Sequence, residues 1–221
     1  MGYYPVFIDL KEKECLVVGG GQVAERKVRA LLAAGARVTV VSPTATSGLQ
    51  RLKAQGAIRR IARDYQPGDL REALLVVACT SSRQVNQEVA REAKRRRRLV
   101  NVVDDPRLCT FIVPAIVRRG DLTIAISTGG KSPALAKKIR EDLQKKYGPE
   151  YGTLLKLLGA VRAKLLTQRP FSANNKVILT RLAKAPLLKL IKEGKGKESE
   201  RLLVKILGPG FSRKELFGNK W

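Results

Sequence analysis

Short apolar runs alternate with amphipathic segments through the first half of the chain. The runs are rich in Val, Leu and Ile, and the segments between them repeat their apolar residues every three or four positions. The first pattern is typical of buried strands and the second of helices that pack on them. Strands that alternate with helices favour an α/β fold with a parallel sheet and right-handed crossovers. The runs predict strands at 15–18, 37–41, 57–62, 74–79 and 99–103, preceded by a short edge strand at 4–10.

Residues at the ends of the amphipathic segments support this division. The segment 23–34 is followed by Gly35 and the segment 44–55 by Gly56, and glycine is a common C-terminal helix cap. Ser81 or Ser82 would cap the helix before the fifth strand. Three of the four connections between the predicted strands are therefore bounded by residues that suit a helix end.

The pattern changes after residue 110. Apolar runs at 111–117 and 122–127 are separated by a connection too short for a crossover, which predicts an antiparallel hairpin. Ser132 and Pro133 then mark the start of a helix. The sequence from Gly152 onward predicts basic, amphipathic helices.

The helical tail has two further candidate helices, at 177–191 and 198–207, and 208–221 is expected to be a loosely ordered end. The predicted organisation is thus a sheet domain, a small α+β region and a helical tail. The predicted boundaries are 1–111, 112–150 and 151–221.

Three consecutive glycines separate the first predicted strand from the first predicted helix. Gly19 would allow the tight turn, Gly21 would let the backbone approach a phosphate, and Ala24 is small enough for close helix packing. Free N–H groups and the positive end of the helix dipole would then face the anion. A G-x-G-x-x-A string is weak alone, but here it lies between a strand and a helix. It predicts a Rossmann-like dinucleotide-binding domain, with a plain strand-to-helix turn as the alternative.

Residue types that the chain lacks narrow its chemistry. It has no histidine, which excludes histidine bases, histidine-ligated metals and Ser-His-Asp triads. Cys15, Cys79 and Cys109 are far apart and lack metal-ligand spacing, so we expect reduced thiols and no metal site. No apolar run approaches the length of a transmembrane helix and no signal peptide is visible. We therefore expect a soluble, cytoplasmic protein that does not bind membranes.

The net charge of +25 arises from 44 Lys and Arg residues against 19 Asp and Glu residues. Such a field attracts polyanions, whether nucleic acid, an anionic membrane or a small molecule with many carboxylates. The basic run at 94–98 resembles a nucleic-acid patch, but it ends a predicted helix, where cations favour the helix dipole. The few aromatic residues are not interleaved with the charge as in a stacking platform. Nucleic acid is therefore the less favoured partner.

Two segments that follow predicted strands carry candidate chemistry. Asp104 and Asp105 follow the fifth strand, at the sheet edge where ligands of such folds bind. They could supply a general base or only shape the turn before the next proline. The segment Thr128-Gly129-Gly130-Lys131-Ser132 precedes a helix. Its amides and its lysine could bind carboxylates, or the segment could be a capped loop without a ligand.

Five segments together resemble one family, precorrin-2 dehydrogenase, which is also the N-terminal module of siroheme synthase. The resemblance implies an NAD-binding Rossmann domain, a dimerisation region built on the hairpin, and a homodimer. It also implies oxidation of precorrin-2, a tetrapyrrole with many carboxylates, to sirohydrochlorin, with NAD⁺ as the hydride acceptor. The segments lie at 4–10, 17–27, 101–106, 111–115 and 126–136, in the family's order and with similar spacing.

The resemblance also implies residue roles. Asp104 matches the family's catalytic aspartate, and Thr128 matches a residue that lines the tetrapyrrole pocket, so we assign the segment 128–132 to substrate binding. For Thr80 a helix-capping role, and for Asn101 a strand-capping role, are alternatives. The positions assigned to the cofactor are Gly19, Gly21, Gln22, Val23, Pro43, Thr44, Thr80 and Asn101.

Two features leave alternatives open. No acidic residue ends the second strand, where 41–43 reads Val-Ser-Pro, so the usual carboxylate for the ribose is missing. The choice between NAD and NADP therefore does not follow from the sequence. Some relatives also insert ferrous iron, so a bifunctional dehydrogenase and ferrochelatase is the first alternative. A charge-driven nucleic-acid-binding protein is the second.

Overall fold

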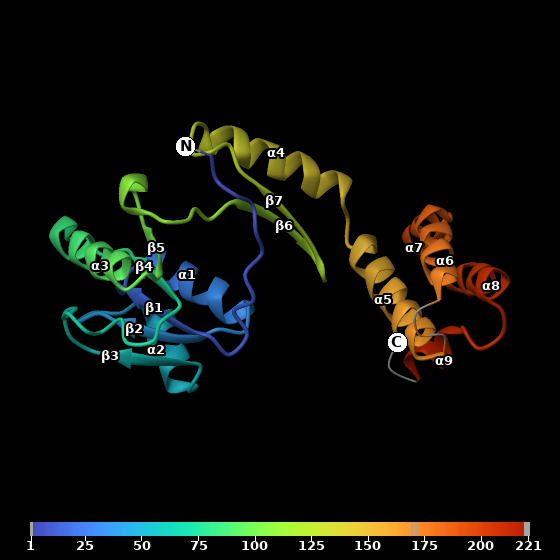
Figure 1. Cartoon of the computed structure of the whole chain (residues 1–221), viewed down its shortest axis with the longest axis horizontal. Coiled ribbons are helices and arrows are strands. Elements are labelled where there is room, and N and C mark those ends of the chain that lie inside the picture. The colour runs from blue at the N-terminus through green and yellow to red at the C-terminus, as the bar shows by residue number, and fades with distance from the viewer. Residues whose placement is uncertain (1, 169, 171, 219–221) are drawn as a thin grey trace. The chain divides into compact units, whose positions relative to one another are not determined.

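The computed structural model describes residues 2–168, 170 and 172–218. It divides the chain into two compact units, Met1–Val113 and Pro114–Trp221. Figure 1 shows a sheet with helices in the first unit, and a hairpin followed by helices in the second.

The first unit is built on a five-stranded parallel sheet with the order β3-β2-β1-β4-β5. The five predicted strands are confirmed, each to within one residue of its ends. The order changes direction at β1, and ligands of such sheets bind at the carboxyl edge beside this switch point. Val18 pairs with both Val41 and Ala78, so the central strands end level at that edge. The strands are β1 Glu14–Val18, β2 Arg37–Val41, β3 Ile58–Ile61, β4 Leu75–Ala78 and β5 Leu99–Val102.

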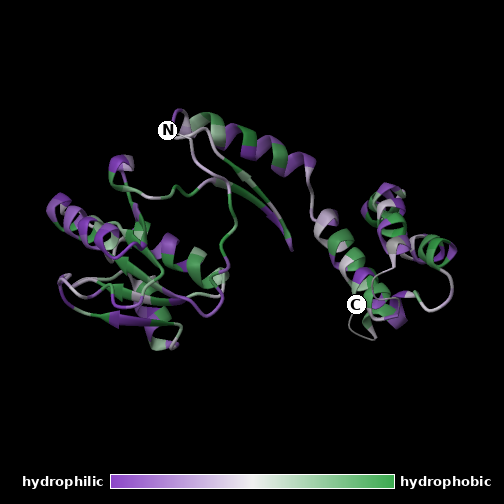
Figure 2. Ribbon diagram, in the orientation of Figure 1, coloured by the Kyte–Doolittle hydropathy of each residue, from purple (hydrophilic) through white to green (hydrophobic). Residues whose placement is uncertain are grey.

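Helices cover both faces of this sheet. Helices α1 (Gln22–Ala33) and α2 (Ser47–Ala54) pack on one face, and α3 (Arg83–Arg95) packs on the other. The helix predicted at 44–55 begins later than expected, because the Thr46 hydroxyl accepts the N–H of Leu49 at 3.2 Å and caps it. Figure 2 shows β3, at one edge of the sheet, as a markedly hydrophilic strand.

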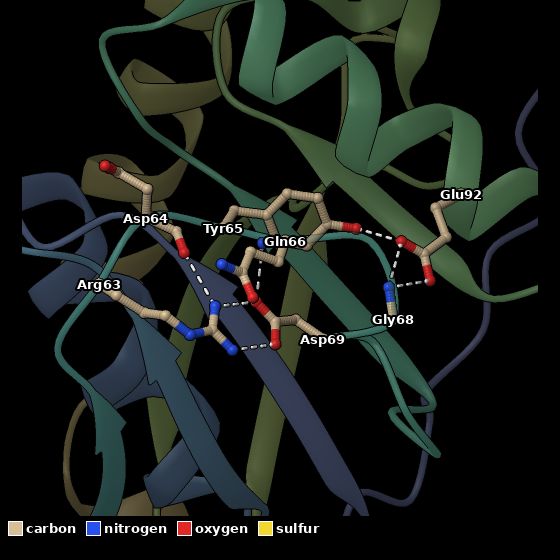
Figure 3. A network of polar contacts seen from close by, with 7 residues as sticks. All are labelled: Arg63, Asp64, Tyr65, Gln66, Gly68, Asp69 and Glu92. Atoms are coloured by element: carbon tan, nitrogen blue, oxygen red, sulfur yellow. Dashed lines mark hydrogen bonds and ion pairs between the residues drawn. The ribbon is translucent and has the colours of Figure 1, made fainter.

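The connection between β3 and β4 contains no helix, and its own side chains cover the sheet instead. Tyr65 and Leu70 are buried with α3. Glu92 of α3 holds the connection, because its carboxylate accepts the Tyr65 hydroxyl and the N–H of Gly68 at 3.1 Å (Figure 3). Burial and this carboxylate raise the pKa of Tyr65, which keeps the phenol protonated as a donor.

An ion pair closes the same connection on its other side. Arg63 donates to both carboxylate oxygens of Asp69 at 2.7 Å (Figure 3). The Arg63 hydrogen bond lowers the pKa of Asp69, so the carboxylate stays ionised at neutral pH. Polar contacts thus hold this long connection in place, where the other connections of the sheet have a helix.

The edge strand predicted at 4–10 is wrong. Residues 2–10 form no regular element and pair with neither edge of the sheet. Pro5 has no N–H to give to a ladder, and Tyr4 and Phe7 are 87% and 76% exposed. The alternation of apolar residues in this segment was therefore not sufficient for it to join the sheet as a strand.

Some residues of the basic run at 94–98 form ion pairs within the first unit. Arg96 pairs with Glu92 at 2.9 Å, and Arg98 pairs with Glu72 at 3.2 Å. These contacts favour the interpretation of the run as a helix end rather than as a nucleic-acid patch.

The second unit opens with an antiparallel hairpin of β6 (Ala115–Arg119) and β7 (Leu122–Ile126). The predicted hairpin is confirmed, but its first strand begins at Ala115 rather than at residue 111. Helix α4 (Pro133–Lys146) follows and packs on both strands. Ser132 caps α4 as predicted, accepting the N–H of Leu135 at 3.2 Å.

The rest of the second unit is helical and has its own apolar core. Leu157, Val161 and Leu165 of α5 are buried in it. None of the helices in the described part of the chain has the length and hydrophobicity needed to traverse a lipid bilayer. The helices are α5 Glu150–Gln168, α6 Ala173–Lys184, α7 Leu187–Lys192, α8 Gly196–Leu207 and α9 Arg213–Phe217.

Two expectations for this part were wrong. The helix predicted at 177–191 is two helices, because Ala185 is extended and Pro186 restarts the chain as the N-cap of α7. The end at 208–218 is not loose, since Ser212 and Glu215 form a capping box that starts α9. The remainder of that predicted segment, 219–221, lies outside the described residues.

Candidate functional site

The loop between β1 and α1 is tightly packed at its first two glycines. Gly19 has φ 127°, and a Cβ on it would lie 2.7 Å from the carbonyl oxygen of Cys79. A Cβ on Gly20 would lie 1.9 Å from the carbonyl oxygen of Thr44. The chain's own packing therefore requires glycine at both positions. The motif spacing assigns no role to Gly20, and its only signal in the sequence was its place in the middle of three consecutive glycines.

Gly21 differs from its two neighbours. It is the N-cap of α1 at φ −80°, makes no side-chain cap, and a Cβ on it would meet no described atom within 4 Å. Packing within the chain does not require glycine here, whereas a ligand that approached the backbone would. The first N–H groups of α1, those of Gln22 and Val23, are left without a side-chain cap. These residues fit the diphosphate of a dinucleotide.

Two hydrogen bonds hold the β1–α1 loop against the β2–α2 loop. The N–H of Gly19 donates to the carbonyl of Val41 at 2.9 Å, and the N–H of Thr46 donates to the carbonyl of Gly20 at 3.0 Å. Residues 43–44, which are exposed, therefore share one sheet edge with the glycine loop.

Glu25 links the starts of α1 and α2. Its carboxylate accepts the Thr46 hydroxyl at 2.6 Å and the Arg29 guanidinium at 2.7 Å, and both lower the pKa of Glu25. Gly48 packs on the same carboxylate, so that a Cβ on it would lie 2.0 Å from Oε1. Glu25 thus positions the loop after β2, a role that the sequence did not predict.

Thr80 follows β4 and is committed to Asn86. Its hydroxyl and its N–H donate to Asn86 Oδ1 at 2.9 and 3.2 Å, and Asn86 Nδ2 donates back to the Thr80 carbonyl at 3.0 Å. Ser82, not Thr80, caps α3. The Thr80 side chain therefore shapes the turn after β4. Its hydrogen-bond partner, Asn86, was not predicted from the sequence.

A cavity of about 530 Å³ opens at the carboxyl ends of β4 and β5. Its lining has both acids of the predicted site and two arginines. Thr80 of the predicted cofactor set also lines it. The polar and charged side chains of the lining include Thr80, Arg83, Asn86, Asp104, Asp105 and Arg107.

The two acids in this cavity differ in their surroundings. Asp105 accepts two hydrogen bonds from Arg107, at 3.1 and 3.3 Å, and these lower the pKa of Asp105. Asp104 is exposed, and in the described structure its carboxylate has no hydrogen bond or ion pair. Asp104 also has φ 65°, a left-handed conformation that Asp tolerates better than most residues. It is the acid that is free to contact a ligand.

Asn101 lies in β5 and is buried. Its Nδ2 donates to the carbonyl of Phe111 at 3.2 Å, and the neighbouring N–H of Val102 donates to Cys109 Sγ at 3.1 Å. Asn101 thus ties the segment after β5 to the sheet, and it is not among the residues that line the cavity. This contact favours a positioning role for Asn101.

Groups of the 128–132 loop hydrogen-bond one another. The Thr128 hydroxyl donates to the Ser132 carbonyl at 3.0 Å and accepts its N–H at 3.2 Å. The N–H of Gly129 donates to a preceding hydroxyl, and that of Lys131 donates to the Thr128 carbonyl, both at 3.1 Å. Within the described residues, the donors of this loop left to bind an anion are the Lys131 ammonium, the Ser132 hydroxyl and the N–H groups of Thr128 and Gly130. The predicted anion site is therefore smaller than its sequence suggested.

Neither thiol chemistry nor a resident metal is supported near the glycine loop. Burial raises the pKa of Cys79 to about 11, so its thiol is protonated at neutral pH. Burial also lowers the pKa of Lys27, which lies near this thiol. Among the described residues, no three His, Cys, Asp or Glu side chains are grouped so that they could hold a metal ion.

Comparison with known proteins identifies the family. Residues 6–115 match a model described as putative NAD(P)-binding, and residues 119–146 match one described as sirohaem biosynthesis protein central. The solved structure of SirC, a precorrin-2 dehydrogenase, is 30% identical with a TM-score of 0.74, and the match covers 90% of this chain and 100% of that one. The chain belongs to the precorrin-2 dehydrogenase and siroheme synthase family.

Curated relatives of this family are longer proteins. The siroheme synthase of Thioalkalivibrio sulfidiphilus is 38% identical over 99% of this chain and 45% of its own length. That of Methylobacillus flagellatus is 48% identical over 68% of this chain and 32% of its own length. The chain thus spans less than half the length of the curated relatives it matches.

The candidate sites fall inside the segments that define the family. The NAD(P)-binding segment 6–115 contains the glycine loop, the cavity and Asp104. The central sirohaem segment 119–146 contains the 128–132 loop. Family membership thus supports a dinucleotide at the glycine loop, but does not itself assign a role to any side chain.

Proposed function

We propose that this chain oxidises precorrin-2 to sirohydrochlorin, with NAD⁺ as the hydride acceptor. The observation that carries the proposal is one sheet edge that combines an uncapped helix start with the unpaired Asp104 in a cavity. The match to a precorrin-2 dehydrogenase over that protein's whole length supports the same reaction. We place the reaction in the cytoplasm, where three free cysteines stay reduced.

In this proposal the chain binds both reactants and accepts one proton. NAD⁺ supplies the hydride acceptor that no side chain provides. The N–H groups at the start of α1 bind its diphosphate, helped by the helix dipole. Asp104 takes a proton from precorrin-2 as the macrocycle loses a hydride. One hydride and one proton leave the substrate, which is oxidised by two electrons.

Asp104 is a better base than Asp105 in these surroundings. Both oxygens of Asp105 are engaged by Arg107, and the lowered pKa of Asp105 makes it a weaker proton acceptor. The Asp104 carboxylate has no competing donor in the described structure. Arg107 thus holds the neighbouring acid and leaves one carboxylate for proton transfer.

Positive charge suits a substrate with many carboxylates. Two arginines and two aspartates line the cavity, so the positive field comes from the net charge of +25 on the chain. A large net charge raises the local concentration of an oppositely charged ligand. We assign Lys131 and the 128–132 loop to the same substrate, as an anion site of the second unit.

Anaerobic turnover tests the proposed reaction. The purified chain, incubated with precorrin-2 and NAD⁺, is expected to form NADH and sirohydrochlorin in equal amounts, each followed by its absorbance. Protein-free and heat-denatured samples give the uncatalysed rate. Absence of NADH above that rate, with both NAD⁺ and NADP⁺ supplied, would contradict the proposal.

We also propose that the chain is a homodimer, with 1–111 as the NAD-binding domain, 112–150 as the dimerisation region and 151–221 as the helical domain. Strands β6 and β7 pair only with each other in the described chain, and a two-stranded sheet is marginally stable alone. Ile116 on β6 and Leu135 on α4 are 39% and 52% exposed. A second copy that covered these side chains would remove them from water.

Substituting Ile116→Glu is expected to convert the dimer into a monomer, because it would bury an unpaired charge in the interface. Sedimentation equilibrium of the wild type and the variant measures the change. Gln144→Glu, which also adds one negative charge, on the exposed side of α4, is the control and is expected to leave the dimer intact. A monomeric wild type, or an Ile116→Glu variant that stays dimeric, would show that the interface lies elsewhere.

A further inference from the structure

The carboxyl end of β2 lacks the element that normally selects NAD over NADP. An acidic residue there binds the ribose 2′-hydroxyl of NAD and repels the 2′-phosphate of NADP. Here β2 ends at Val41, and Ser42 and Pro43 follow. The end of β2 therefore neither binds the 2′-hydroxyl of NAD nor repels the 2′-phosphate of NADP.

A cation lies at the position where that acid is missing. Val40 of β2 pairs with Arg60 of β3 in parallel register, so both side chains emerge on the face covered by α1 and α2. Arg60 Nη2 donates to the carbonyl oxygens of Ser42 at 3.1 Å and Pro43 at 2.8 Å. The guanidinium therefore reaches the loop after β2, from the hydrophilic edge strand in Figure 2.

The chain itself does not satisfy this guanidinium. In the described structure, no carboxylate oxygen lies within 4.0 Å of the Arg60 guanidinium, so Arg60 forms no ion pair there. Its Nε is buried without a hydrogen-bond partner among the described residues. Because Nη2 donates to both carbonyls and Nε is buried, the two N–H groups of Nη1 are the donors left for a ligand. An uncompensated cation thus stands beside the exposed Pro43.

We propose that Arg60 forms a subsite for the 2′-phosphate of NADP, so that the chain accepts NADP⁺ as well as NAD⁺. The two N–H groups of Arg60 Nη1 would donate charge-assisted hydrogen bonds to a phosphate. The subsite rests on the dinucleotide site of the proposed function and extends it by one anion.

Calorimetric titration with NAD⁺ and NADP⁺ isolates the 2′-phosphate, which is the only difference between the two ligands. The wild type is expected to bind NADP⁺ at least as tightly as NAD⁺. Arg60→Met is expected to weaken NADP⁺ binding about tenfold and to leave NAD⁺ binding within about twofold, the size of one lost charge-assisted contact.

Arg59→Met is the matched control. Arg59 is exposed, is the next residue on β3 and emerges on the opposite face, so its loss changes the net charge equally without touching the loop after β2. It is expected to alter neither affinity. An equal effect of both substitutions would assign the preference to general charge and overturn the subsite.

The remaining outcomes are distinguishable. Weaker binding of NADP⁺ than NAD⁺ by more than tenfold in the wild type would overturn the subsite while the dinucleotide site stands. Binding of neither ligand would instead remove the proposed function. Arg60→Lys, which keeps the charge but loses the planar guanidinium, is expected to lose about threefold in affinity for NADP⁺. If Arg60→Met does not fold, the affinity of Arg60→Lys for NADP⁺ tests the subsite instead.

Discussion

Asp104→Asn is expected to lower kcat for precorrin-2 oxidation by about 10²- to 10⁴-fold, the usual contribution of a general base. The amide has almost the same shape as the carboxylate but cannot accept the proton. Asn also tolerates the φ of 65° at this position, so the turn after β5 should keep its conformation. Anaerobic NADH formation at saturating NAD⁺ and precorrin-2 measures kcat.

Asp105→Asn provides the comparison within the same turn. Asp105 is engaged by Arg107, and its loss is expected to change kcat less than about threefold. Both variants should retain the wild-type affinity for NAD⁺, which shows that the cofactor site is intact. A full rate for Asp104→Asn, or a large loss confined to Asp105→Asn, would assign the proton to another group.

The parallel sheet was predictable because most of its strands are short and apolar on both faces, and because three of its four connections contain a helix with recognisable ends. β1, β2 and β4 are buried almost throughout, and that pattern does not depend on contacts with distant residues. The segment 4–10 shows the limit of the same reasoning. Its apolar residues would suit a strand, but a strand also needs a free edge and a register, neither of which is written in the segment itself.

Local signals also decided the two helical corrections. Pro186 divides the predicted helix at 177–191, although the apolar repeat continues across it. The capping box of Ser212 and Glu215 lies in a short basic stretch whose length alone suggested a loose end. In both places a specific helix-start residue outweighed the average character of the segment.

Candidate site residues were predictable only where a backbone motif or the family resemblance marks them. Gly19 and Gly21 follow from the strand–turn–helix pattern, whereas Asp104 was assigned by the resemblance, because its place after a strand suits a turn as well. Asn86 and Arg60 act through hydrogen bonds to residues 6 to 18 positions away, across a turn or between strands. No rule of residue spacing predicts such pairs, because the fold and not the local sequence brings them together.

Gly20→Ala is expected to weaken NAD⁺ binding at least tenfold and to lower the free energy of unfolding by about 1–3 kcal/mol. The added Cβ would lie 1.9 Å from the Thr44 carbonyl oxygen and 2.7 Å from Ser42 Oγ, so the loops after β1 and β2 must move apart. That movement would also break the 3.0 Å hydrogen bond from Thr46 to the Gly20 carbonyl. Calorimetric titration and urea unfolding measure the two effects.

Gly21→Ala separates the role of packing from the role of ligand approach. Its φ of −80° suits alanine, and the Cβ would meet no described atom within 4 Å, so unfolding should change by at most about 1 kcal/mol. The same Cβ would project where the diphosphate approaches the helix start, so NAD⁺ affinity should still fall at least tenfold. A destabilised Gly21→Ala variant, or one that binds NAD⁺ normally, would contradict a diphosphate at this turn. The contrast between adjacent glycines therefore tests the dinucleotide site independently of any substrate.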